Sequence, residues 1–76
     1  MPSTNWKYEE QGRRRRDEIL EAVGKFIDDH GYSPTHQELA EMVGVSKYTI
    51  QRHVKVLVEE GRLTEAAGPR TLRLPL

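Results

Sequence analysis

Two short helical segments separated by a tight turn constrain this chain more than any other feature. Thr35 followed three positions later by Glu38 predicts a capping box, in which each side chain accepts a hydrogen bond from the backbone of the other residue. Gly44 ends this helix, because glycine readily adopts the left-handed conformation of a tight turn. Ser46 is a suitable N-cap for the next helix, expected over residues 46–60 and ended by Gly61. Two helices joined in this way predict a helix-turn-helix.

The second of these helices has an apolar and a polar face. Ile50, Val54 and Leu57 repeat at helical spacing and predict its buried side, with Val58 as a further candidate. The opposite side carries basic, amide and hydroxyl groups and has no acid before Glu59, which is the mixture that contacts DNA in a major groove. The candidates are Lys47, Tyr48, Thr49, Gln51 and Arg52 for base edges, and Ser46 and Lys55 for phosphates.

Two alternatives remain for this face. Its charged residues could form the solvated side of an ordinary amphipathic helix. Tyr48 could lie at the edge of the core instead of contacting DNA.

An earlier helix is predicted from five apolar residues that fall on one side at helical spacing. They are Ile19, Leu20, Val23, Phe26 and Ile27. We expect this helix to start between Glu10 and Arg14 and to stop at His30 and Gly31. Residues 1–12 are then a polar, flexible N-terminal arm, and residues 13–76 form the folded domain.

Four consecutive arginines, residues 13–16, open this helix. Cations are disfavoured at a helix N-terminus, so the run invites an external anion, and Arg13 and Arg14 are candidate phosphate contacts. The alternative is a solvated arm that keeps the protein soluble. A helix that starts earlier, near Trp6 or Tyr8, would instead make the arginines a helical phosphate-binding stripe.

After Gly61 the apolar period changes from helical to alternating. Leu63 lies between polar residues, and Leu72 and Leu74 alternate with Thr71 and Arg73 across a Gly-Pro turn at 68–69. A two-stranded β-hairpin is therefore predicted. Three helices followed by a hairpin give a mostly α, winged helix-turn-helix fold, with Arg70 and Arg73 near the tip of the wing and available to DNA.

Composition sets further limits on this chain. Its 76 residues allow one small domain, and the absence of cysteine excludes disulfides and thiolate metal sites. The net charge is zero but polarised: basic and acidic residues number five and three in 1–17, one and six in 18–43, and six and three in 44–76. A neutral domain of this kind can bind phosphate through its basic face.

No apolar run suits a membrane helix or signal peptide, so a cytoplasmic protein is expected.

Catalysis and metal binding are not predicted. The serines are explained by a tail, a turn and a cap, and no glycine-rich phosphate loop occurs. His30, His36 and His53 do not have metal-ligand spacing, and we expect no cofactor. His30 suits a helix C-terminus and His36 a surface position, whereas His53 is either a phosphate donor or a packing histidine.

The motifs described above resemble the N-terminal DNA-binding domain of LexA-type repressors over about residues 14–74. The residues that carry the resemblance are Asp17 to Leu20, Gly31 to Thr35, Glu38 to Ala40, Gly44 to Ser46, His53 and Val54, Leu57, Gly61, and Arg70 to Leu74. The resemblance implies a winged helix-turn-helix that works as a dimer on a two-part operator. The family's self-cleaving peptidase domain is missing from these residues, so a complete chain of this length is not expected to cleave itself.

The sequence thus predicts a small bacterial or phage transcriptional repressor that binds double-stranded DNA and occupies a promoter. Thr35, at the start of the first motif helix, joins the candidate DNA contacts. A homodimer is expected because one small module rarely reaches useful specificity alone, with the Trp6 arm or the 74–76 tail as candidate seams. We expect no membrane or small-molecule partner. The alternatives are an architectural, recombination or replication factor, and a protein-protein interaction module.

Overall fold

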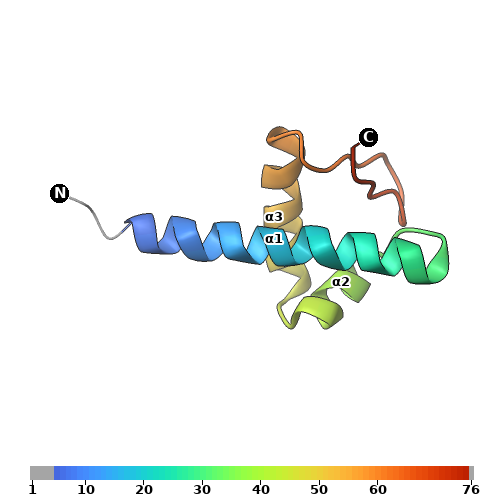
Figure 1. The fold of residues 1–76 in the computed structure, drawn as a ribbon, viewed down its shortest axis with the longest axis horizontal. Helices are drawn as coiled ribbons and strands as arrows, with labels where there is room; N and C mark the ends of the chain where they lie inside the picture. The colour runs from blue at the N-terminus through green and yellow to red at the C-terminus, as the bar shows by residue number, and fades with distance from the viewer. Residues whose placement is uncertain (1–4, 76) are drawn as a thin grey trace.

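The computed structural model describes the backbone of residues 5–75 and the side chains of residues 10–75. Three helices follow one another along the chain: α1 (Asn5–His30), α2 (His36–Val43) and α3 (Lys47–Glu59). In Figure 1, α3 crosses α1 steeply, α2 lies beside their crossing, and residues 60–75 fold back over the C-terminal half of α1. The mostly α, three-helix class predicted from the sequence is confirmed.

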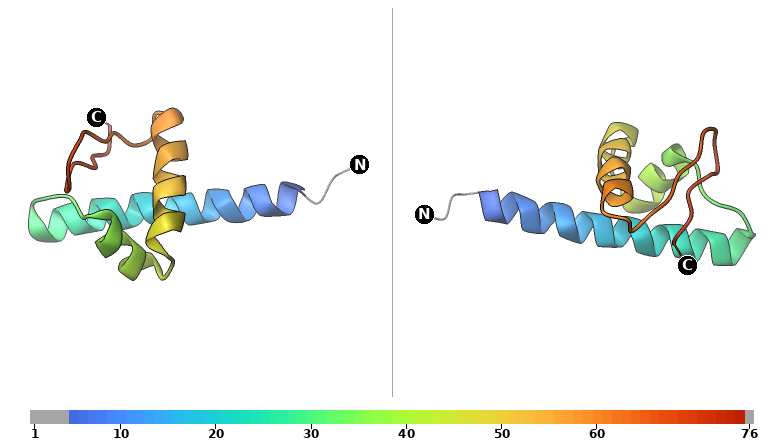
Figure 2. Two further views of the ribbon diagram at one scale, coloured as in Figure 1. Left: turned by 180° about the vertical axis from the view of Figure 1, so that it is seen from behind. Right: turned by 90° about the horizontal axis from the view of Figure 1, so that it is seen from above.

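Helix α1 starts earlier than expected. It begins at Asn5 and not between Glu10 and Arg14, so the alternative of an early start holds and residues 5–12 have helical backbone. Arginine, glutamate and glutamine favour helix, and Arg14 pairs with Glu10 one turn away at 3.5 Å. Its N-terminal turns project beyond the other elements in every view (Figures 1 and 2). None of the helices described is both long and apolar enough to span a membrane.

The core lies where the three helices and the C-terminal segment meet. Its fully buried members come from every element and are Ile19, Val23, Leu39, Ala40, Ile50, Val54, Leu57, Leu63 and Leu72. Leu20 and Ile27 pack at the edge of this cluster, while Phe26 is buried at the end of α1. Val58, a further candidate for the buried side of α3, is 40% exposed, because it lies about 100° around the helix from the buried Leu57.

The turns of the helix-turn-helix have the predicted chemistry. Both hydrogen bonds of the capping box are present, from the Glu38 amide to Thr35 Oγ1 at 3.1 Å and from the Thr35 amide to Glu38 Oε1 at 2.9 Å. Gly44 has φ 83° and its amide donates to the carbonyl of Ala40. Ser46 caps α3 and accepts from the amide of Thr49. These contacts fix the angle at which α3 leaves α2.

The predicted hairpin is reduced to one antiparallel bridge, between Thr64 and Arg73, among the residues described. Each amide of this pair donates to the other carbonyl, at 2.8 and 2.9 Å. Beyond this bridge a side chain holds the turn: the Thr71 hydroxyl shares its single proton between the carbonyls of Ala66 and Gly68, at 2.7 and 3.0 Å. We call residues 62–75 the wing. Leu63 and Leu72 anchor it in the core.

Candidate nucleic-acid interface

The outward side of α3 carries the residues predicted to contact DNA. Lys47, Tyr48, Gln51, Arg52 and Lys55 are all exposed, and Tyr48 is exposed to 67%. The alternative that Tyr48 belongs to the core edge is therefore wrong. The guanidinium of Arg52 lies 5.8 Å from the centre of the Tyr48 ring, which is within cation–π range.

Ser46 and Thr49 form a local pair at the start of α3. Ser46 Oγ accepts from the Thr49 amide at 3.1 Å and donates to Thr49 Oγ1 at 3.0 Å. The Ser46 hydroxyl therefore already uses its proton and one of its lone pairs in hydrogen bonds. Because a hydroxyl has a single proton, Thr49 keeps its own proton available as a donor.

A groove of about 400 Å³ separates the start of α3 from the wing. Its walls come from the two motif helices and from the wing, namely Pro34, Thr35, His36, Gln37, Lys47, Gln51, Glu65, Gly68, Pro69, Arg70, Thr71 and Leu72. Four of the sequence-predicted contacts, Thr35, Lys47, Gln51 and Arg70, thus share one concave surface. Thr35 is half-buried, and its hydroxyl serves the capping box.

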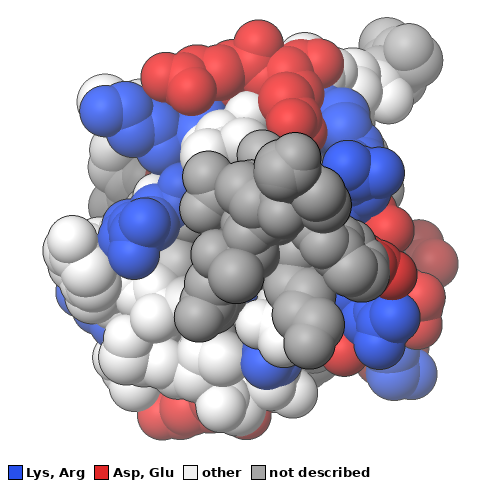
Figure 3. Space-filling model, turned by 90° about the vertical axis from the view of Figure 1, so that its left-hand side faces the viewer, with Lys and Arg blue, Asp and Glu red and all other residues white. Residues whose placement is uncertain are grey.

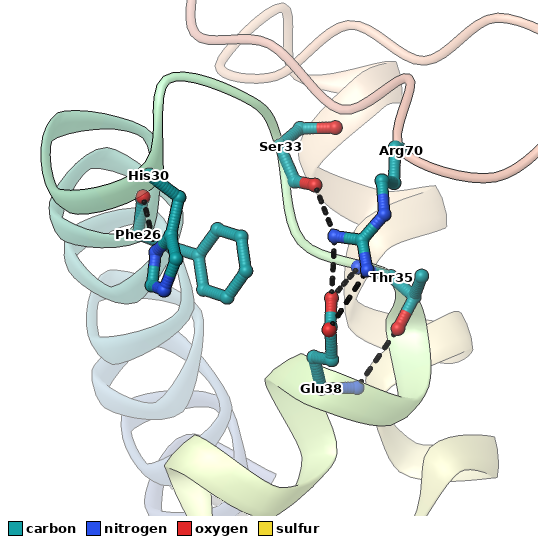
Figure 4. A network of polar contacts seen from close by, with 6 residues as sticks. All are labelled: Phe26, His30, Ser33, Thr35, Glu38 and Arg70. Carbon is teal, nitrogen blue, oxygen red and sulfur yellow. Dashed lines mark hydrogen bonds and ion pairs between the residues drawn. The ribbon is translucent and has the colours of Figure 1, made fainter.

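Arg70 was expected to be available to DNA. Instead, its guanidinium turns back onto the domain (Figure 4). It donates to both carboxylate oxygens of Glu38, at 2.8 and 3.0 Å, and to the carbonyl of Ser33 at 3.1 Å. It also lies 4.7 Å from the centre of the Tyr32 ring. The hydrogen bond from Arg70, followed by that from the Thr35 backbone, holds the pKa of Glu38 below its ordinary value. The sequence reasoning missed this clasp, which joins residues 32 positions apart.

The remaining predicted arginines lie at two other places. Arg73 is exposed on the wing, beside the bridge to Thr64. Arg13 and Arg14 are exposed on the projecting part of α1. Figure 3 views the molecule toward that end of α1, and Lys and Arg side chains appear on both sides of it. The predicted contacts therefore form one set on α3 and its groove, with outlying members on α1 and the wing.

A second basic group lies where α1 faces α3. The sequence offered its members only separately, the arginines as a phosphate-binding stripe and His53 as a phosphate donor or a packing residue. Arg15 and Arg16 of α1 and His53 of α3 are all half-buried. Arg15 donates to Glu18 Oε1 at 3.1 Å and to the carbonyl of Val43 at 3.4 Å, so it ties α1 to the end of α2. Burial lowers the pKa of His53, and the positive charges of Arg16, Arg52 and Arg15 lower it further. The arginine run was visible in the sequence, but its proximity to His53 was not.

The other two histidines have local partners. His30 Nδ1 lies 3.0 Å from the carbonyl of Phe26, and the two rings stack with centres 4.1 Å apart, at the helix C-terminus as expected. His36 Nε2 lies 2.6 Å from Glu65 Oε2, which links the start of α2 to the wing. In residues 10–75 no group of three or more histidine or carboxylate side chains is placed to hold a metal ion.

Comparison with known families gives one match that covers most of the chain. The family model described as the LexA DNA binding domain matches residues 10–71. Similar proteins include the LexA repressor of Limosilactobacillus reuteri (strain DSM 20016), 36% identical over 58 residues, which are 74% of this chain and 28% of that protein. The LexA repressor of Pseudomonas aeruginosa (strain LESB58) is 33% identical over 63 residues, which are 80% of this chain and 31% of that protein. The chain thus spans less than a third of these relatives.

A solved structure supports the fold independently. The Zalpha domain of Carassius auratus PKZ, determined in complex with Z-DNA, superposes with a TM-score of 0.69 and covers 86% of this chain and 98% of that one. The two sequences are 20% identical, so the likeness concerns the fold alone.

Proposed function

Since this chain belongs to the LexA DNA binding domain family, we propose that it binds double-stranded DNA in a sequence-specific manner, with α3 in the major groove. The proposal gives Lys47, Tyr48, Gln51 and Arg52 the base edges, and Lys55 the phosphates. Thr49 is half-buried beside them and assists from the same turn.

The observation that carries the proposal is the free outer side of α3. Five long basic, amide and aromatic side chains are exposed there, while the opposite side of the helix is buried in the core. Side chains of this kind match the donor and acceptor pattern of base pairs in the major groove, and arginine and glutamine can make bidentate contacts to guanine and adenine. Exposed side chains of this kind do not fit a helix that docks another protein through an apolar surface.

The wing contributes to the proposed interface in a less direct way. Arg73 lies at the bridge with Thr64 and not near the tip of the wing as expected. We assign it to a backbone phosphate because its side chain is exposed there. Arg70 takes a positioning role, since its donors are directed at Glu38 and Ser33. It holds the Gly68 and Pro69 turn across the groove from Lys47, where DNA lying on α3 would meet the wing. Arg13 and Arg14 extend the contact to phosphates along α1.

We further propose that the protein is a non-catalytic repressor of bacterial or phage type that acts by occupying a promoter. The support for this role is the similarity to the LexA repressors of Limosilactobacillus reuteri and Pseudomonas aeruginosa, which are longer proteins. A homodimer on two half-sites provides the required specificity, since one small module makes few base contacts. Of the two seams predicted, the side chain of Trp6 and the residue Leu76 lie outside the described part of the chain.

Fluorescence anisotropy tests the proposal. A labelled duplex from upstream of the coding region of this protein is titrated beside a scrambled duplex at three salt concentrations. We expect the first duplex to bind about a thousandfold more tightly than the second. Equal, steeply salt-dependent binding to both would favour an architectural role. Absence of binding to either would favour a protein-interaction module and contradict the proposal.

A further inference from the structure

A small groove of about 140 Å³ lies beside α3 where that helix faces α1. It is lined by Arg16, Thr49, Arg52, His53 and Val56, of which four carry hydrogen-bond donors and none carries a carboxylate. We infer that this groove seats one phosphate of the DNA backbone, with Arg16 and His53 as its principal ligands. The inference rests on the proposed function and adds to it a binding site and a dependence of DNA affinity on pH.

Arg16 supplies the strongest observation for an anion. Its Nε is buried and has no hydrogen-bond partner in the structure. A buried N–H that is left unpaired is costly, and a charged guanidinium is costlier than a neutral group. The end of the side chain folds back over Gly12, where a Cβ atom would lie 3.1 Å from Arg16 Nη1. Arg16 also lines the groove, so a phosphate oxygen seated there would place a charged acceptor beside its guanidinium.

Thr49 adds a donor from α3, and Arg52 adds positive charge at the rim of the groove. The Thr49 hydroxyl accepts from Ser46, so its proton can be donated into the groove that it lines. Arg52 lines the same groove and also lies over the exposed Tyr48 ring. It therefore connects the groove to the outer side of α3. A duplex that meets this side would bring its backbone to the groove at the flank of the helix.

His53 adds a group that can take up a proton at the site. The charged groups that share a groove with it are Arg14, Arg15, Arg16 and Glu18 from α1 and Arg52 from α3. The carboxylate of Glu18 is held by Arg15 at 3.1 Å, and the arginines together favour the neutral imidazole. A bound phosphate reverses this balance, because a negative charge favours the imidazolium. Binding of DNA should therefore be coupled to uptake of a proton by His53, and affinity should rise as pH falls.

The test uses the whole 76-residue chain and a labelled duplex of random sequence, because a backbone phosphate is present in any sequence. Dissociation constants are measured at pH 5.5, 6.5 and 7.5 and at several salt concentrations for the native protein, Arg16→Gln and His53→Gln. Lys25→Gln is the matched charge control on α1, and His30→Gln is the matched histidine control. Thermal unfolding shows whether each variant is folded. If Arg16→Gln is not folded, Arg16→Met takes its place, because it also removes the charge.

We expect the native protein to bind several-fold more tightly at pH 5.5 than at pH 7.5, and His53→Gln to lose this dependence. Arg16→Gln should reduce the salt slope by about one. The controls should follow the native protein. Unchanged pH dependence in His53→Gln, with an unchanged slope in Arg16→Gln, would overturn the inference while native binding leaves the proposed function standing. A native protein that binds no duplex would overturn both.

A second measurement distinguishes a DNA phosphate from a free anion. The imidazole proton resonances of His53 are titrated with pH in the free protein, with the duplex, and with inorganic phosphate at equal ionic strength. The pKa of His53 should rise with the duplex and not with millimolar inorganic phosphate. An equal rise with inorganic phosphate would make the groove a general anion site, and no rise with the duplex would exclude a phosphate beside His53.

Discussion

Arg70 and Glu38 face each other as a bidentate pair, with Nη1 and Nη2 of the arginine 2.8 and 3.0 Å from the two carboxylate oxygens. The same carboxylate accepts the Thr35 amide, so one side chain both caps α2 and holds the wing (Figure 4). Arg70 has φ 59°, a left-handed conformation that is uncommon for residues other than glycine. The pair therefore ties this residue of the wing to the start of α2.

Replacing Glu38 by glutamine should loosen the wing without unfolding the helices. The amide oxygen can still accept the Thr35 amide, but the charge-assisted pair with Arg70 is lost. Amide hydrogen exchange at Thr64 and Arg73, the bridge of the wing, should become faster in Glu38→Gln. Glu41→Gln, also on α2 and exposed, is the control. Unchanged exchange at both amides would show that the clasp does not hold the wing.

The same carboxylate gives a pH dependence of stability. Because the folded-state pKa of Glu38 lies below its ordinary 4.5, the folded protein holds this proton less tightly than the unfolded chain does. Its contribution to the free energy of unfolding is present above pH 4.5 and is lost as pH falls through the folded-state pKa. Urea unfolding between pH 3 and 6 should therefore show a shallower acid decline for Glu38→Gln than for the native protein.

His53 should weaken the fold over a different pH interval. Its folded-state pKa lies below the ordinary 6.5, so the unfolded chain binds the proton more readily. The free energy of unfolding is expected to decline as pH falls below 6.5 and to level off below the folded-state pKa. His53→Gln should lack this part of the decline in urea unfolding of the free protein. A native protein whose stability is constant between pH 5 and 7 would contradict the assignment.

Leu72→Ala should destabilise the whole domain and not the wing alone. Leu72 is 1% exposed and belongs to the same cluster as Ile19, Leu39 and Leu57. Such a truncation costs about 2–5 kcal/mol, a large share of the roughly 5–15 kcal/mol that a small domain has. Circular dichroism should show loss of helix at a lower temperature. The exposed Leu74→Ala is the comparison, and equal effects of the two would place Leu72 outside the core.

Gly24→Ala should stabilise the protein. A Cβ atom at this position would meet Leu74 Cδ1 at 3.4 Å, an ordinary contact with a side chain that is 42% exposed and can adjust. Alanine in a helix interior is favoured over glycine by about 0.5–1 kcal/mol, which corresponds to about 2–8 °C in the Tm of a domain this small. Calorimetry measures the change, and a lower Tm would mean that Leu74 is held rigidly against α1.

Gln51→Ala should reduce discrimination between sequences while leaving the fold intact. Gln51 is exposed on α3 and lines the groove opposite the wing. Loss of a bidentate base contact costs about 1–3 kcal/mol for the cognate duplex and nothing for a scrambled one. The ratio of the two affinities, measured by anisotropy, is the readout. An equal loss on both duplexes would make Gln51 a backbone contact.

The helical part of this fold was readable from the sequence because its signals are local. Thr35 with Glu38, Gly44, Ser46 and Gly31 are caps and stops that act over one turn, and each lies where it was expected. The buried sides of α1 and α3 followed from helical spacing for the same reason. The start of α1 was misplaced because no cap residue marks it in the sequence. The short pairing of the wing did not follow because alternation of apolar residues cannot show how long a ladder is.

The candidate interface divides in a similar way. By itself, the sequence determined that one helix has a basic, acid-free side opposite an apolar one, because a fixed helical period assigns residues to sides. Only the tertiary structure decided that Arg70 turns back to Glu38 and that Arg16 meets His53. Those pairs are separated by 32 and 37 positions, and their contact depends on the angles at which the helices cross and the wing returns. Such angles arise from the packing of the shared core, and no single segment of the chain forms that core alone.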